Sequence, residues 1–168
     1  VWLTETGCTS DAGLTQRTDY PNSPESQAAD VFRRIVTAWA NGDQAVFWHT
    51  VVSSRDRPRN RWRGYGLTDA NAVPKPAFWT LRLLSAHLKG YTSVSPMAGL
   101  GRGQYGYAFT LPNGSHRWVV WGRGEIAEPS SPYAKGMTSV VSVDGGKHSW
   151  RAVPERIALS QTPLLLRN

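Results

Sequence analysis

Apolar and polar residues alternate along the first half of the chain in two patterns, one typical of strands and one typical of helices. Residues 1–5, VWLTE, form a short apolar segment that predicts a strand. Residues 23–42 carry apolar side chains at helical spacing. Ser23 can cap this helix, Pro24 suits its first position, and Asn41-Gly42 ends it. The apolar face of such a helix needs a sheet to cover it.

A second strand and a second helix follow in the same alternation. Residues 44–52, QAVFWHTVV, form a continuous apolar run that predicts a strand buried on both faces. Residues 76–89 place leucines on one helical face, and Gly90 is a suitable helix stop. The order strand, helix, strand, helix is typical of a parallel α/β architecture.

From Tyr91 onward the pattern changes to alternating strands separated by turns. Asn113-Gly114 and Asp144-Gly145 are hairpin-turn dipeptides between apolar segments, and RIALS and PLLLR predict closing strands. We therefore predict two domains of different class: an α/β domain over residues 1–90 and an antiparallel β-sandwich over residues 91–168.

Composition and charge narrow the functional classes. The chain has 168 residues, 40% hydrophobic and 18% charged, which predicts a globular protein, and no apolar run is long enough for a membrane span. The net charge of +7 is concentrated in residues 55–63, RDRPRNRWR. This segment is interpreted as a solvated loop or as a contact surface for substrate or another chain. No nucleic-acid-binding signature accompanies the charge, so neither nucleic acid nor membrane is an expected partner.

The sequence around three candidate motifs argues against a disulfide, a nucleotide-binding loop and a zinc site. Cys8 is the single cysteine, which excludes an internal disulfide and suits a small buried residue. Gly101, Gly103 and Gly106 fit the spacing G-x-G-x-x-G, but an alternating strand follows them where a phosphate-binding helix would be required. The four histidines lack zinc-ligand spacing.

One carboxylate is left without an obvious structural role. Strand alternation places Val1, Leu3 and Glu5 on one face, and Gly7 then lets the chain turn away. A carboxylate on a covered face is costly unless it is paired or used. Glu5 is therefore either a structural partner of an arginine or a helix end, or a functional residue.

The first 89 residues resemble the C-terminal quarter of the (β/α)8 barrel in the retaining glycoside hydrolases of clan A, which include β-xylosidases and glucanases. WLTETG resembles barrel strand seven, VFWHTV resembles strand eight, and GLTDANAVPKPAFWTLRLLSAHL resembles the returning loop and last helix. A small β-sandwich often follows the barrel in that clan. The resemblance thus implies the last quarter of a TIM barrel followed by a β-sandwich.

The resemblance also assigns roles. It implies that Glu5 is the catalytic nucleophile and that Trp48 forms the aromatic wall under the sugar. His49, Arg55 and Asp56 lie near the same rim in sequence and are expected to reach substrate hydroxyls. Retaining hydrolysis uses two carboxyls and water, so no metal or organic cofactor is implied.

The chain lacks two features of that family: most of the barrel and the Asn-Glu pair that supplies the acid. A whole barrel takes about 250 residues, and this chain holds two of eight βα units. The clan supplies its acid from an Asn-Glu pair on strand four, and this sequence has no Asn-Glu dipeptide. We expect that the other six units lie on a partner chain, have been removed by processing, or are missing. We also expect that a second polypeptide or self-association covers the first strand. The chain alone is then inactive, and family habit favours secretion.

A second hypothesis belongs to a different class. The β domain is then a non-catalytic module whose aromatic residues bind carbohydrate or pack a core. The residues concerned are Tyr105, Tyr107, Trp118 and Trp121. Aromatic residues that alternate along a hairpin more often serve packing than sugar binding.

Overall fold

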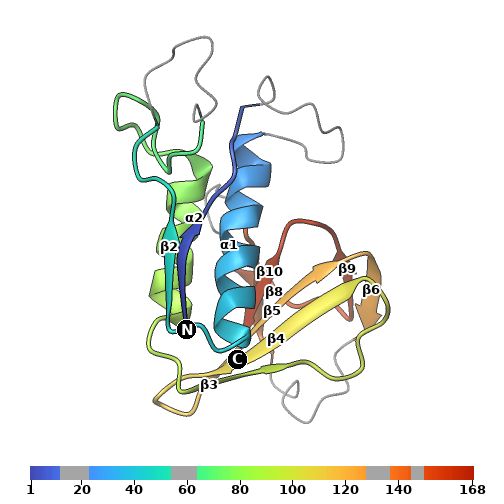
Figure 1. Cartoon of the computed structure of the whole chain (residues 1–168). Coiled ribbons are helices and arrows are strands. Elements are labelled where there is room, and N and C mark those ends of the chain that lie inside the picture. The colour runs from blue at the N-terminus through green and yellow to red at the C-terminus, as the bar shows by residue number, and fades with distance from the viewer. Residues whose placement is uncertain (12–22, 54–63, 128–136, 145–149) are drawn as a thin grey trace. The chain divides into compact units, whose positions relative to one another are not determined.

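The computed structural model describes residues 1–11, 23–53, 64–127, 137–144 and 150–168 (Figure 1). The chain divides into two compact units whose boundary lies between Leu83 and Leu84, within one helix. Among the described residues, the first unit comprises Val1–Leu83 and Asp144, and the second comprises Leu84–Val143 together with residues 150–168. The assignment of residues 1–90 and 91–168 as separate domains stays a prediction.

The first unit alternates strands and helices. Its elements are β1 (Trp2–Thr6), α1 (Pro24–Ala40), β2 (Ala45–Trp48) and α2 (Pro76–Leu88), of which α2 continues into the second unit. β1 and β2 run side by side as parallel strands, and α1 connects them (Figure 1). The predicted strand, helix, strand, helix order with parallel pairing is confirmed.

The local sequence sets the ends of α1 as predicted. The Ser23 hydroxyl oxygen accepts a hydrogen bond from the Ser26 backbone N–H at 3.1 Å, and the Ser26 hydroxyl oxygen accepts one from the Ser23 N–H at 2.8 Å. At the other end Asn41 is the C-cap, and Gly42 adopts the left-handed φ of +86° that favours glycine. The apolar face of α1 is buried through Ala28, Val31, Phe32, Ile35 and Val36, whereas Trp39 is half-buried.

β2 differs from the prediction of a strand buried on both faces. It ends at Trp48, and Phe47 within it is 50% exposed. Val51 and Val52, predicted to continue the strand, are 59% and 45% exposed. Among the described residues β2 pairs with β1 alone, so the two-stranded sheet has no further strand to cover its apolar side chains. An apolar run identifies strand residues but does not show what covers them.

The second unit is antiparallel throughout its described strands. They are β3 (Ser93–Pro96), β4 (Gln104–Thr110), β5 (His116–Gly122), β6 (Gly124–Ala127), β7 (Ser139–Ser142), β8 (Arg151–Ala152), β9 (Arg156–Leu159) and β10 (Leu164–Arg167). Six of them form a sheet in the order β3-β4-β5-β10-β7-β8, and β6 pairs with β9. The predicted closing strands correspond to β9 and β10.

The two sheets of the second unit share one hydrophobic core. Ile126 on β6 and Ile157 on β9 belong to the same buried cluster as Trp118 and Val120 on β5. The result is a small two-layer antiparallel structure, in agreement with the predicted fold class for this part of the chain.

Turn predictions in the second unit have mixed outcomes. Asn113-Gly114 lies between β4 and β5 as predicted, and Gly114 has a φ of +77°. Gly106 lies within β4, so the glycine-rich segment leads into a strand and not a helix, as the sequence predicts. The Asp144-Gly145 turn falls partly outside the described residues.

Candidate active site

Two parallel strands bring three of the predicted site residues, Glu5, Trp48 and His49, to one edge. Glu5 is the penultimate residue of β1, Trp48 is the last residue of β2, and His49 follows it. Thr6 lies opposite Trp48 in the register, and the His49 backbone N–H donates to the Thr6 carbonyl at 2.7 Å. The carboxyl ends of parallel strands meet at the same edge of a sheet, which is where α/β proteins bind ligands. Glu5, Trp48 and His49 therefore share one rim.

The Glu5 carboxylate contacts the histidine that follows β2. His49 Nδ1 lies 3.4 Å from Glu5 Oε1, and the two side chains are 38% and 65% exposed. The strand register shifts between Leu3 and Thr6. This shift interrupts the simple alternation that predicted Glu5 on a covered face with Leu3. In this chain the carboxylate is accessible to a ligand.

Tyr65 is a third aromatic residue at this rim, and sequence reasoning missed it. Its backbone carbonyl accepts a hydrogen bond from the Trp48 indole Nε1 at 3.3 Å. Its ring lies edge-on to the His49 ring, with 6.2 Å between centroids. Trp48, His49 and Tyr65 thus form one connected group beside Glu5. No motif marks Tyr65, because its contacts are made with residues about sixteen positions earlier.

A charged network in α1 supports the end of β1. Arg34 Nη1 donates to the Thr6 hydroxyl oxygen at 3.3 Å, and its Nε donates to the Asp30 carboxylate. Arg33 adds a second, 3.4 Å contact to Asp30, which is 5% exposed. Charge-assisted hydrogen bonds to the buried Asp30 carboxylate fix the positions of the two guanidinium groups. The residue next to Glu5 is therefore fixed both by the partner strand and by the helix.

The remaining predicted site residues, Arg55 and Asp56, fall outside the described residues. Within the described part of the chain, no group of three or more histidine, cysteine, aspartate or glutamate side chains is placed to hold a metal ion. Within the same residues, neither helix is long and apolar enough to cross a membrane.

Two titratable side chains with shifted pKa values belong to or contact the segment that leaves β1. Cys8 is buried as predicted, and burial, with a smaller contribution from Asp30, raises the pKa of its thiol. Lys75 Nζ donates to the Gly64 carbonyl at 2.8 Å and to the Ser10 hydroxyl at 3.2 Å. Burial disfavours the charged form of Lys75 and lowers its pKa from 10.5 to about 8.

The lowered pKa of Lys75 predicts a specific pH dependence of stability. Between pH 8 and 10.5 the unfolded chain keeps a proton that the folded chain has released, so the free energy of unfolding should rise with pH in this window. We expect the stability of the natural chain to rise relative to that of Lys75→Met in urea unfolding at several pH values. A difference between the two chains that stays constant from pH 7 to 11 would contradict this assignment.

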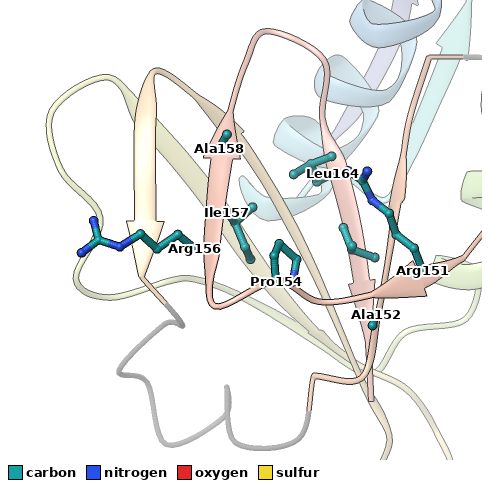
Figure 2. Close-up of a pocket in the computed structure, with 8 residues that line it drawn as sticks. Arg151, Ala152, Pro154, Arg156, Ile157, Ala158 and Leu164 are labelled. Atoms are coloured by element: carbon teal, nitrogen blue, oxygen red, sulfur yellow. The ribbon is translucent and has the colours of Figure 1, made fainter.

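The described residues of the second unit also line a pocket. It has a volume of about 240 Å³ and lies beside β8, β9 and β10 (Figure 2). Val140, Ile157 and Leu164, which belong to the hydrophobic core, contribute to its lining. The Arg156 side chain extends away from the other lining residues in Figure 2 and pairs with Glu125 at 3.6 Å. This pocket is mainly apolar and contains none of the predicted site residues.

Comparison with solved structures reveals glycoside hydrolases of the same fold. A family 39 glycoside hydrolase from the gut symbiont Bacteroides cellulosilyticus matches with a TM-score of 0.75 and 21% sequence identity, over 99% of this chain and 33% of that chain. An endo-β1,6-glucanase matches with a TM-score of 0.51 and 16% identity, over 99% of this chain and 34% of that chain. No family model and no curated protein matches the sequence.

These likenesses concern the fold. The chain spans about a third of the length of the two solved hydrolases, and it has the fold of that third. The resemblance to glycoside hydrolases seen in the sequence is therefore supported at the level of fold class. The complete barrel, the chemical roles of the rim residues and the substrate go beyond the comparison.

Proposed function

We propose that this chain is the nucleophile-bearing part of a retaining glycoside hydrolase. The observation that carries the proposal is the Glu5 carboxylate, which stands at the carboxyl edge of two parallel strands with His49 Nδ1 3.4 Å away and Trp48 at the end of the neighbouring strand. Barrel enzymes keep their catalytic groups at this end of their strands. A glycoside hydrolase fold over 99% of the chain adds support.

In the proposed reaction Glu5 attacks the anomeric carbon of the sugar. The glycosidic C–O bond breaks, an acid residue protonates the departing oxygen, and a glycosyl ester of Glu5 forms. The same acid residue, now a base, removes a proton from water, which attacks the anomeric carbon and releases the sugar and the Glu5 carboxylate. His49 orients the carboxylate from 3.4 Å, and the Trp48 indole offers a flat surface to the C–H face of the sugar.

We propose that the second carboxyl comes from outside this chain. Retaining enzymes place their two carboxyls about 5–5.5 Å apart, and the family that the sequence resembles takes the acid from an Asn-Glu pair that this sequence lacks. We propose that further βα units complete a barrel, either in the same protein or on a partner chain. We use the term completed enzyme for this chain together with the remaining βα units of the barrel.

The apolar face of the two-stranded sheet is the proposed contact with those units. Val1 is 88% exposed and Trp2 is 63% exposed, and the Trp2 ring lies 6.2 Å from that of Phe47, which is 50% exposed. Large apolar side chains gathered on an open sheet usually mark a surface that another element covers. Further units added to this sheet would bury these side chains.

The alternative of a non-catalytic carbohydrate-binding module has less support. Trp118 is 1% exposed and Trp121 is 6% exposed, so neither indole presents a face to solvent. Tyr105 is 51% exposed but stacks on Trp121, with 5.6 Å between ring centroids. This stacking suits cross-strand packing, and it leaves one exposed ring where a sugar platform commonly uses several.

The proposal is tested by native mass spectrometry of the protein purified from its source, followed by assays on aryl xylosides, glucosides and arabinosides. We expect this chain in a species that holds at least six further βα units, on the same or another polypeptide, and hydrolysis by that species. An active species that lacks this chain, or a species with the further units but no glycosidase activity, would contradict the proposal.

A further inference from the structure

Gln27, in the first turn of α1, is a polar side chain with no exposed surface. Burying an amide costs free energy unless its polar atoms find partners. In the first turn of a helix its side chain can reach back toward the loops that precede the helix. Gln27 Oε1 has no hydrogen-bond partner among the described residues, so the contacts of Nε2 indicate why an amide is kept in this position.

The Gln27 amide nitrogen binds backbone carbonyls from two separate segments. It lies 2.9 Å from the carbonyl oxygen of Cys8, 2.9 Å from that of Gly64 and 3.1 Å from that of Tyr65. The segments are 19 and 37 or more residues away from it in sequence. The Gln27 amide thus links the segment that leaves β1 to the segment that carries Tyr65, in addition to the Ser10 backbone N–H, which donates to the Gly64 carbonyl at 3.1 Å. Of these donors, Gln27 is the one that also reaches the Tyr65 carbonyl.

The carbonyl of Tyr65 is shared between Gln27 and the proposed site. It accepts hydrogen bonds from Gln27 Nε2 and from the Trp48 indole Nε1. The other segment begins at Cys8, three residues after Glu5. A shift of either carbonyl changes the relative positions of Glu5, Trp48 and Tyr65.

We propose that Gln27 is a positioning residue, which sets the spacing between the nucleophile-bearing strand end and the Trp48–Tyr65 pair. The inference rests on the proposed function for its catalytic meaning, whereas the positioning itself is a property of this chain. Two N–H groups are required, because they are shared among several carbonyl oxygens. A side chain of similar size without these donors should release the Tyr65 segment.

The test measures hydrogen exchange of the Trp48 indole N–H by NMR on the chain itself, with the resonance assigned through Trp48→Phe. In Gln27→Met we expect this hydrogen to exchange at least about 10-fold faster than in the natural chain, because local opening becomes easier. Gln44→Met, at an exposed position of the same unit, is the matched control and should leave the rate unchanged.

Gln27→Glu gives a second signature that loss of packing would not produce. Near neutral pH the introduced carboxylate only accepts, and it would face carbonyl oxygens; after protonation it donates one hydrogen bond. Relative to the natural chain, we expect the excess exchange of Trp48 to shrink between about pH 7 and about pH 5. This variant keeps the test valid if Gln27→Met does not fold.

Two results would overturn the inference: Trp48 exchange that is unchanged in both variants, or equal acceleration at the indole of Trp39, on α1 of the same unit, which would report general destabilisation of that unit. Exchange on the isolated chain is independent of hydrolysis. The positioning role and the proposed function can therefore fail separately. If both hold, Gln27→Met in the completed enzyme should lower kcat more than it changes KM.

Discussion

Replacement of Glu5 by glutamine is expected to lower kcat of the completed enzyme on an aryl glycoside by about 10⁴-fold or more. Glutamine keeps the size and one oxygen of the side chain but removes the negative charge that attacks the anomeric carbon in the proposed reaction. Because Glu5 is 65% exposed and its contact with His49 is a surface pair, the exchange should leave stability within about 0.5 kcal/mol.

Glu25 supplies the matched control for this substitution. It is exposed in the first turn of α1, on the same unit, and its exchange to glutamine removes the same charge. Glu25→Gln should retain nearly full activity. Glu5→Gln with more than a tenth of the natural kcat would show that the nucleophile is another residue.

Replacement of Gly7 by alanine is expected to destabilise the first unit by about 2–4 kcal/mol. A Cβ at this position would lie 2.5 Å from the His49 carbonyl oxygen and 3.3 Å from the Tyr65 ring. The nearer of these atoms belongs to the backbone, so the two strand ends must separate. In the completed enzyme, a displacement of Glu5, the proposed nucleophile, by about 1 Å should reduce kcat on the order of 10²-fold.

The stability change can be followed through Cys8, the single cysteine of the chain. Its thiol is buried, so alkylation in increasing urea reports opening of the first unit. Gly42→Ala is the control: it meets no atom within 4 Å, and its left-handed φ should cost about 1 kcal/mol. Equal midpoints for the two variants would show that the contact at Gly7 is not tight.

Local signals in the sequence identified most of the elements. Ser23 and Pro24 predicted the start of α1, Gly90 predicted the end of α2, and Asn113-Gly114 predicted the β4–β5 hairpin. Each of these residues acts on its immediate neighbours in the chain, so no knowledge of distant contacts was needed. The placement of Glu5 and Trp48 on one rim was implied by the resemblance of their segments to two successive barrel strands.

Features that depend on distant contacts were not predictable in the same way. Tyr65 and Gln27 take part in the candidate site through hydrogen bonds to residues 17 to 38 positions away, and no motif marks either residue. The exposure of Phe47 depends on which strands surround β2, which an apolar run alone does not show. A register shift in β1 also altered the alternation from which the environment of Glu5 had been predicted.

In the proposed mechanism Glu5 forms a covalent bond with the sugar. The direct measurement is to treat the completed enzyme with an activated 2-deoxy-2-fluoro glycoside of the sugar it hydrolyses, digest it, and locate the added mass by tandem mass spectrometry. We expect one fluoroglycosyl group per chain, attached to Glu5, and no such group in the Glu5→Gln variant. A label on a different carboxylate would contradict the account, as would rapid turnover with inversion at the anomeric carbon.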